Sequence, residues 1–190
     1  MQLDGVKWVP NAHIDKYSAE QVEWVRSKTG LLEPKGDTFE AFNMTPEDGV
    51  IDVEGNELTT AGLTRITSLI NGAGGQALTN TATRIGVGNS NTAFAAGQTD
   101  LQAAAGSSNR FFMTMDATYP STSAGVITAR ATFGVSDGNF VWNEWGLDIG
   151  TPTVTSGTTV NATLVNRRVA SMGTKASGAT WVFTVTVTLS

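Results

Sequence analysis

Residues 181–189 read Trp-Val-Phe-Thr-Val-Thr-Val-Thr-Leu, and this stretch decides the fold class. Every second residue from Trp181 to Leu189 is a large apolar one, while Val182 and three threonines lie between them. A period of two places the two sets on opposite faces of an extended chain. The stretch therefore predicts a half-buried antiparallel strand with one core face and one threonine face.

Several other stretches between residues 110 and 170 also have strand character. Residues 127–135 alternate in the same way, and the ranges 110–118, 140–149 and 160–170 are further strand candidates. Clusters of turn-forming residues at 120–123, 136–139 and 156–158 separate them. Short strands with turns at this spacing predict a mainly β fold, an antiparallel β-sandwich of about six to eight strands, jelly-roll or immunoglobulin-like.

Helical signals are confined to the first 71 residues. Leu63, Ile66, Leu69 and Ile70 recur at helical spacing behind a threonine cap, so we expect one helix over 58–70, packed against the sandwich. Further towards the N-terminus, Ser18 and Gln21 have the spacing of a capping box, and Gly30 is a natural helix end. Thr45-Pro46-Glu47-Asp48 resembles a second helix start.

Charge is distributed unevenly along the 190 residues, of which only 15% are charged. Residues 1–60 hold 5 Lys/Arg and 12 Asp/Glu, a net charge of −7, whereas residues 61–190 hold 7 and 5, a net of +2. We therefore divide the chain into an extended, acidic N-terminal arm with short helices (1–57) and a β-sandwich domain (58–190). A surface so poor in charge suits a part that packs into an assembly.

The composition argues against several functions. Without cysteine and with His13 as its one histidine, the chain offers no thiol nucleophile and no multi-histidine metal site, so we expect neither metal nor cofactor. The net charge of −5 without a basic stripe argues against nucleic acid. No apolar run reaches the length of a membrane span, and we expect no signal peptide at the N-terminus.

Enzyme motifs are equally weak. Gly86-Val87-Gly88 begins like a dinucleotide loop, but a strand followed by a turn explains it better because no capped helix follows at once. Glu144 and Asp148 are too far apart along one strand face for a glycosidase pair. We therefore expect no catalytic residues.

The tetrapeptide Trp142-Asn143-Glu144-Trp145 is the most unusual in the chain. In a regular strand Trp142 and Glu144 share one face, and an aromatic ring beside a carboxylate could bind a sugar. The simpler interpretation makes both tryptophans core or interface anchors and pairs Glu144 with an arginine. The candidate partners are Arg130, Arg167 and Arg168. The full set of interface or anchor candidates is Trp8, Trp24, Trp142, Glu144, Trp145, Arg167 and Arg168.

Four stretches together resemble a family of small structural proteins of tailed bacteriophages, especially those of actinobacterial hosts. They are Gly55–Leu63; Thr83–Asn89, followed by Thr99-Asp100-Leu101; Ala131-Thr132-Phe133 with Asn139 and Trp142–Leu147; and Leu164–Arg168 with Gly173-Thr174-Lys175. The resemblance covers roughly residues 55–190 and rests on the order of these motifs. It implies a virion component, described variously as a capsid decoration, minor capsid or minor tail protein, and it supplies no catalytic residues.

From this resemblance we expect a non-enzymatic bacteriophage virion structural protein. The favoured form is a capsid-associated decoration or minor capsid protein that binds the shell through its arm and aromatic anchors. The alternatives are a minor tail or tail-tip protein and a host-glycan-binding β-sandwich module. The expected partners are the major capsid protein or other virion proteins and further copies of the chain as a homo-oligomer, with a host glycan in the last alternative. The expected location is the virion, assembled in the host cytoplasm.

Overall fold

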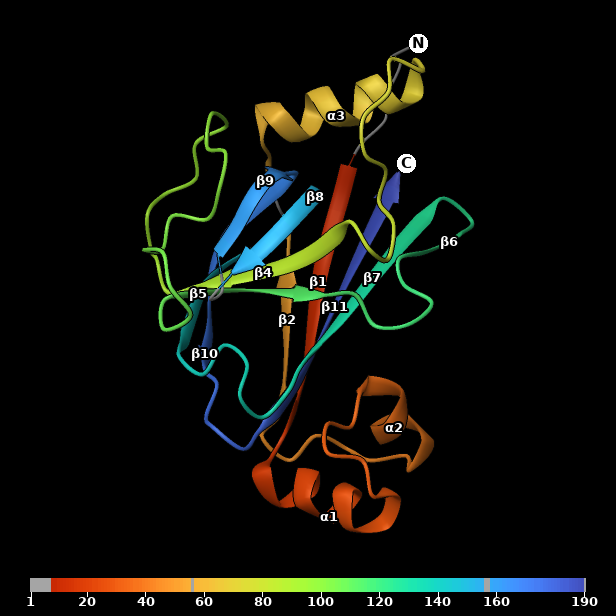
Figure 1. The fold of residues 1–190 in the computed structure, drawn as a ribbon, viewed down its shortest axis with the longest axis vertical. Helices are drawn as coiled ribbons and strands as arrows, with labels where there is room; N and C mark the ends of the chain where they lie inside the picture. Colours follow the sequence, from red (N-terminus) through yellow and green to blue (C-terminus); the bar gives the residue numbers. More distant parts are fainter. Residues whose placement is uncertain (1–7, 56, 156–157, 190) are drawn as a thin grey trace.

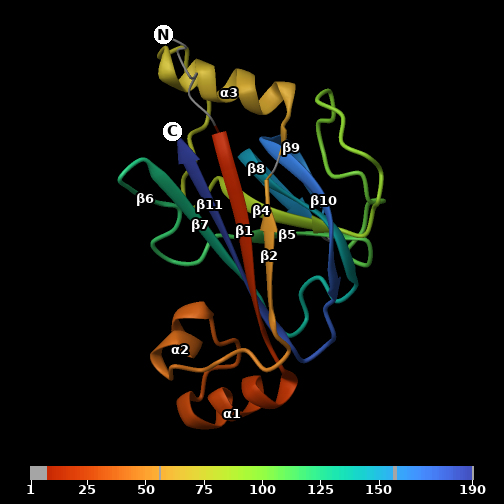
Figure 2. The same cartoon turned by 180° about the vertical axis from the view of Figure 1, so that it is seen from behind.

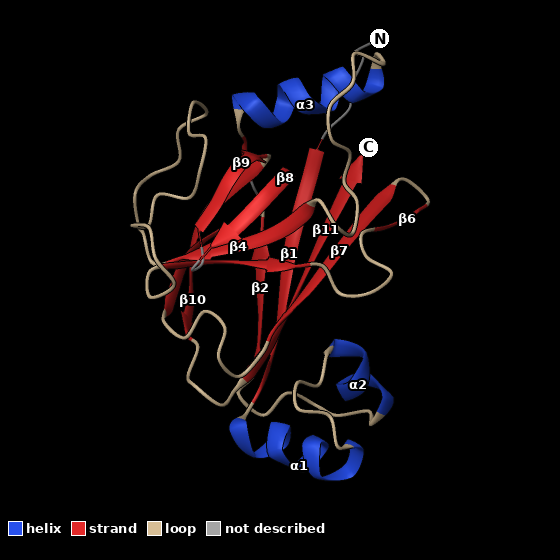
Figure 3. Cartoon of the chain, viewed as in Figure 1, coloured by secondary structure: helices blue, strands red, loops and turns tan. Residues whose placement is uncertain are grey.

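The computed structural model describes residues 8–55, 57–155 and 158–189, and the side chains of 151–162 and 189 are not described. The chain is mainly β, as the sequence predicts, with two antiparallel sheets packed against each other (Figures 1 and 3). The first sheet has the spatial order β2 (Val50–Glu54), β1 (Trp8–Tyr17), β11 (Thr180–Leu189), β7 (Val126–Phe133) and β6 (Ser121–Ser123).

The second sheet has the order β3 (Glu57–Leu58), β10 (Asn166–Thr174), β8 (Val141–Thr155), β4 (Thr83–Gly88) and β5 (Arg110–Thr114), and β9 (Thr158–Leu164) pairs with β8. The described residues thus form eleven strands, more than the six to eight expected. The range 160–170 contains parts of two strands, because Val165 separates β9 from β10. Gly86-Val87-Gly88 ends strand β4, as the simpler interpretation of that motif predicts.

Side chains from both sheets form one large core. Ile14, Phe133 and Phe183 of the first sheet are fully buried, as are Ile85 and Leu147 of the second. Strand β11 has the alternation that its sequence predicts, because Trp181, Phe183, Val185 and Val187 all point into this core. The apolar face of residues 181–189 therefore stabilises the contact between the sheets.

Residues 8–17 are not part of an extended arm, contrary to expectation. They form β1, which pairs along its whole length with β11 on one side and, from Asn11 to Asp15, with β2 on the other. Ala12 and Ile14 face the core, whereas Asn11 and His13 lie on the opposite face. The side chains of β1 that face inward also include a proline and Lys16. The sequence therefore shows only a weak apolar alternation, although β1 has a partner strand on each side.

Residues 18–49 form what we call the helical lobe, at the end of the molecule opposite α3 (Figures 1 and 2). It contains α1 (Ala19–Thr29) and α2 (Gly36–Ala41). The predicted capping box of Ser18 and Gln21 is confirmed, and Gly30 ends α1 in the left-handed conformation. Thr45-Pro46-Glu47-Asp48 does not begin a helix but leads into a turn.

The lobe is joined to the first sheet by a small core of its own. The ring of Tyr17, at the end of β1, stacks on Phe39 of α2 with 4.0 Å between ring centroids. Val22 and Val25 of α1 and Val182 of β11 complete this cluster. Val182 belongs to the face of β11 that carries the threonines, so the lobe covers one end of that face. Residues 18–49 are therefore a packed extension of the sheet.

Helix α3 (Thr60–Ile70) ends where the sequence predicts, begins two residues later than the predicted 58–70, and packs less than expected. Thr59 caps it, Gly62 is its one buried residue, and Ile66 lies against the main core. Leu63 is 53% exposed and Ile70 is 81% exposed. The helix thus lies across one end of the sheets with much of its apolar surface uncovered. None of the described helices has the length and apolar character needed to cross a membrane.

Candidate functional site

The two tryptophans of the Trp-Asn-Glu-Trp motif lie in the main core. Trp142 contacts Phe133 and Trp181 edge to face, with 4.7 Å between ring centroids in each pair, and Trp145 packs against Phe183. Both indoles are fully buried. The expected strand face is wrong for Trp142, which packs on the same side as Trp145 and not with Glu144. The pairing of β8 with β10 changes register at this point, between Val169 and Gly173, and interrupts the simple alternation.

Glu144 forms a fully buried ion pair with Arg167, one of the partners that the sequence suggests. Its Oε2 atom lies 2.5 Å from the Nε of Arg167. The backbone amides of Gln102 and Ala103 donate to the same carboxylate at 3.0 and 2.7 Å. Because these groups surround the carboxylate, a substrate cannot reach it. The charge is balanced and fully hydrogen-bonded, as a buried carboxylate requires.

This ion pair fastens a long loop, residues 89–109, over the outer face of the second sheet. The guanidinium of Arg167 donates to the Thr92 carbonyl and to the Gln98 side chain, at 2.8 and 3.1 Å. Leu101 packs beneath the loop against Phe112 and Leu164. The loop is therefore bound to the sheet at several points along its length. We call residues 89–109 the strap.

Asp148 lies in the same polar layer on β8 and is almost completely buried. Burial, together with the nearby Asp100 carboxylate, raises the pKa of Asp148 to about 7, against the opposing effect of Arg84. Burial likewise raises the pKa of Asp100, although Arg110 pairs with it at 2.9 Å. Arg110, at the start of β5, also donates to the Leu101 carbonyl at 3.2 Å and so fastens this part of the strap to the sheet.

Arg168 and Trp8 are half-buried, and neither is a free surface anchor. Arg168 is the strand partner of Trp145 across β10 and β8. Trp8 begins β1 and packs against the main core. Neither residue shares a hydrogen bond or ion pair with Glu144 or Arg167, so the four residues do not form one binding site. Of the seven candidates, only Trp24 is substantially exposed.

Trp24 lies on α1, and 45% of its surface is exposed. Its ring contacts Phe42 edge to face, with 5.2 Å between centroids, and the Lys28 ammonium lies 5.6 Å from the ring centre. Phe42 is also 40% exposed. An exposed aromatic pair is the kind of feature that dominates binding energy at protein interfaces.

A groove of about 490 Å³ runs beside Trp24, and we call it the lobe groove. It is lined by Glu20, Gln21, Trp24, Met44, Thr45 and Glu47. Gln21 holds its two sides together, because its amide donates to the Thr45 carbonyl at 2.7 Å and accepts from the Glu47 backbone at 3.0 Å. The groove therefore combines an aromatic ring, a methionine and two carboxylates on a fixed backbone.

Sequence reasoning identified Trp24 and missed the rest of the groove. Ser18 and Gln21 were recognised as a helix cap, but the contacts of Gln21 with the segment around Thr45 depend on tertiary folding. The one sequence feature that pointed to the rest of the groove was the excess of acidic residues in the lobe. Residues 18–49 contain 3 Lys/Arg and 7 Asp/Glu, a net charge of −4.

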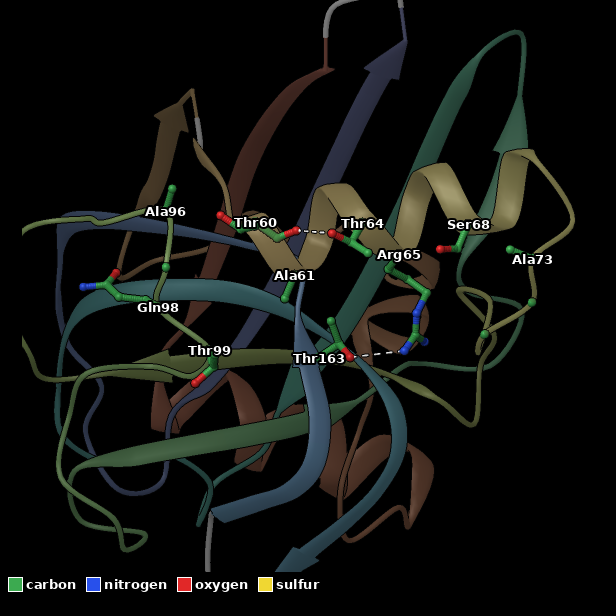
Figure 4. A pocket seen from close by; sticks show the side chains of 13 residues that line it. Thr60, Ala61, Thr64, Arg65, Ser68, Ala73, Ala96, Gln98, Thr99 and Thr163 are labelled. Atoms are coloured by element: carbon green, nitrogen blue, oxygen red, sulfur yellow. Dashed lines mark hydrogen bonds between the residues drawn. The ribbon is translucent and has the colours of Figure 1, made fainter.

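A larger cleft of about 710 Å³ lies beside α3 (Figure 4). Its lining is rich in hydroxyl groups, with Thr60, Thr64, Ser68, Thr99 and Thr163 among its residues, and it includes Arg65 and Gln98. The Arg65 guanidinium is engaged, since it donates to the Gln76 carbonyl at 3.0 Å and to Thr163 at 3.3 Å. The lining has neither a carboxylate nor an aromatic ring, so it resembles neither a hydrolytic site nor a sugar-stacking platform.

His13 lies on the outer face of the first sheet between two carboxylates. Its Nδ1 atom is 2.7 Å from Asp52 on β2, and its Nε2 atom is 3.1 Å from Asp15. Burial alone would lower the pKa of His13, but the hydrogen bonds and negative charges of Asp52 and Asp15 together outweigh this effect and raise it. The three residues thus cross-link β1 and β2 on the outer face of the first sheet.

No cluster of three or more potential metal ligands occurs among the described residues. No protein-family model, curated protein or solved structure matched the chain. The site must therefore be interpreted from its own geometry. That geometry favours the lobe groove and the exposed aromatic pair beside it as the candidate binding surface.

Proposed function

We propose that this protein is a non-enzymatic bacteriophage virion structural protein, associated with the capsid as a decoration or minor capsid protein. The fold that we propose with it is a β-sandwich, jelly-roll or immunoglobulin-like, to which the two packed antiparallel sheets correspond. The proposal starts from the resemblance of residues 55–190 to virion proteins. Its structural support is the placement of exposed apolar side chains on the surface.

The observation that carries the proposal is exposed apolar surface at both ends of a closed core. On the helical lobe, Trp24, Leu31, Leu32 and Phe42 are exposed, Leu32 to 82%. At the opposite end, α3 exposes Leu63 and Ile70. Large apolar side chains gathered on the surface mark contact sites. A rigid body with contact surfaces at two ends is suited to joining neighbours in an assembly.

The glycan-binding alternative loses the residues on which it was based. Trp142 and Trp145 are fully buried, so their rings cannot stack on a sugar. A minor tail protein would use the same exposed surfaces as a capsid protein. The position of the protein in the virion separates these two functions.

Immunogold labelling of intact virions tests the proposal. Antibody against the protein, detected by electron microscopy, is expected to label particles over the head. Virions of an unrelated phage serve as the control for non-specific antibody. Label confined to the tail or its tip would contradict the capsid assignment and select the minor tail protein. Particles without label, both intact and gently disrupted, would overturn the virion function altogether.

A further inference from the structure

We propose that the lobe groove binds an arginine side chain, next to an apolar residue, from a basic segment of another virion protein. This inference rests on the proposed virion function for the identity of the partner and deepens it by naming the partner's chemistry. The argument for the arginine itself depends on the groove alone. It combines the charge of the groove, its aromatic wall and the distribution of cations over the rest of the chain.

The rim of the groove is acidic, and its carboxylates are exposed to a ligand. Glu20 and Glu47 are both exposed and line the same groove. The Glu47 Oε2 atom accepts from the Ser18 hydroxyl at 2.9 Å, and Glu20 has no ion-pair partner among the described residues. The surrounding lobe has a net charge of −4. A cation entering the groove would meet two carboxylates in a field of its preferred sign.

The aromatic wall favours arginine over lysine. A planar guanidinium stacks on an aromatic ring and can also bind carboxylates through several N–H groups at once. Lys28 places a cation 5.6 Å from the Trp24 ring centre, which shows that a positive charge can approach this ring. Met44 and the exposed Phe42 lie near enough to the ring to receive an apolar neighbour of the arginine. The volume of the groove lies in the range of sites that enclose small ligands.

A second copy of the chain does not offer this cation from its sheets. Beyond residue 60 the chain has seven Lys/Arg residues. Five of them are buried: Arg84, Arg110, Arg130, Arg167 and Lys175. Arg65 is engaged in its own cleft, and Arg168 is half-buried. On the lobe, the exposed cations Lys28 and Lys35 are lysines, and Arg26 is half-buried and paired with Glu23 at 2.6 Å. No arginine among the described residues is exposed, so the groove is matched to an arginine of a different protein.

Titration of the intact protein with short peptides, followed by NMR, tests this binding mode. The probes are N-acetyl-leucyl-arginine amide and, as the neutral control, N-acetyl-leucyl-glutamine amide. The indole N–H resonance of Trp24, assigned with Trp24→Phe, is expected to shift to saturation with the arginine peptide only. The other four indoles are expected to stay unchanged. An equal shift with the glutamine peptide, or no shift of the Trp24 indole, would overturn the proposal.

Two matched double variants test whether the groove carboxylates bind the arginine. Glu20→Gln/Glu47→Gln is expected to weaken binding roughly tenfold, since each exposed ion pair contributes a few-fold in affinity. Glu33→Gln/Glu54→Gln removes the same charge outside the groove and is expected to leave the affinity within about twofold. Equal losses in both variants would contradict a local site. All four side chains are exposed, so unchanged melting temperatures are expected to show that each variant is folded.

The titration uses no virions, so its result is independent of the labelling experiment. Label over the head with no peptide binding would reject the groove and keep the virion function. Arginine-specific binding with no label on virions would reject the proposed function and the viral partner, while the groove would remain an arginine site.

Discussion

At the scale of single residues, the Glu144–Arg167 pair links the second sheet to the strap. Both side chains are fully buried, and together they hold the strap at four positions, two backbone amides on one side and a carbonyl and a side chain on the other. Burying two charges costs solvation energy, which the many short hydrogen bonds offset here. The sequence predicts an arginine partner because a glutamate in a core strand needs a cation, and the structure selects Arg167 from the three candidates.

Replacing one partner of this pair should be more harmful than replacing both. Glu144→Gln leaves the Arg167 guanidinium buried without a counter-charge, and we expect a loss of roughly 3–5 kcal/mol in the free energy of unfolding. Glu144→Gln/Arg167→Met removes both charges and is expected to recover part of that loss. Urea denaturation of the two variants measures the difference, and proteolysis should cut faster within residues 89–109 in the single variant. A double variant no more stable than Glu144→Gln would contradict this account.

Asp148 should make stability depend on pH. Its pKa is raised to about 7, so the folded protein keeps a proton that the unfolded chain releases near pH 4. Its stabilising effect is present in acid and is lost as the pH rises towards and through about 7. Asp148→Asn cannot ionise, and its advantage over the native protein is expected to grow by roughly 2–3 kcal/mol between pH 5 and pH 8. Urea denaturation at both pH values checks this, and an advantage independent of pH would contradict it.

At the scale of elements, helix α3 is positioned by the absence of a side chain at one residue. A Cβ atom at Gly62 would lie 2.0 Å from the Val165 carbonyl oxygen, at the junction of β9 and β10. Thr59 adds a cap to the helix and a backbone hydrogen bond to the Val165 carbonyl. The helix is thus held by its first turn, and its last turn carries the exposed Ile70.

Because the backbone between β9 and β10 approaches Gly62 so closely, helix propensity should give the wrong sign for the stability change of a substitution there. Propensity alone would make Gly62→Ala stabilising by about 1 kcal/mol. We expect instead a destabilisation of roughly 1–3 kcal/mol, because backbone atoms must move to admit the methyl group. Thr64→Ala on the exposed side of the same helix is the control and should change stability little. Thermal unfolding followed by circular dichroism gives both values, and a more stable Gly62→Ala protein would refute the packing described.

The elements that could be predicted from sequence are those whose local signals agree with their surroundings. Strand β11 alternates cleanly, and α1 has both a capping box and Gly30. Strand β1 was missed because its inward side chains include Pro10 and Lys16, and Lys16 is buried through a hydrogen bond to the distant Met172 carbonyl. Helix α2 was missed because Pro34 and Gly36 resemble helix breakers. Gly36 is in fact needed, since a Cβ there would press on Val182.

The candidate site was only partly predictable for a related reason. Trp24 could be selected because a large aromatic residue on a short acidic helix is conspicuous. Met44 and Glu47 come next to it only when the chain turns back after α2, and no local pattern encodes that turn. Trp142 likewise lies in the core, against the alternation expected for a regular strand, next to the register change between β10 and β8.

At the scale of the whole molecule, the two parts proposed from charge are joined by the central pairing of β1 with β11. This pairing predicts that residues 58–190 alone do not fold, because the β11 edge and the core around Ile14 would be open. The isolated fragment is expected to give a poorly dispersed ¹H–¹⁵N NMR spectrum, whereas the full chain gives a dispersed one. A dispersed fragment spectrum would show that the sheets are complete without β1. For the same reason, point variants and not deletion of the first 57 residues are the proper test of the lobe.

The pairing of β1 with β11 also constrains synthesis. Its partner residues are separated by more than 160 positions, since Tyr17 pairs with Thr180 and Trp8 with Leu189. On the ribosome, β1 emerges long before β11, and the pairing between them cannot form until β11 has left the exit tunnel. Folding through contacts so distant in sequence is slow, and incomplete sheets associate readily. Nascent chains on crowded polysomes would therefore hold unpaired strand edges close together, which makes chaperone supply during translation a determinant of yield.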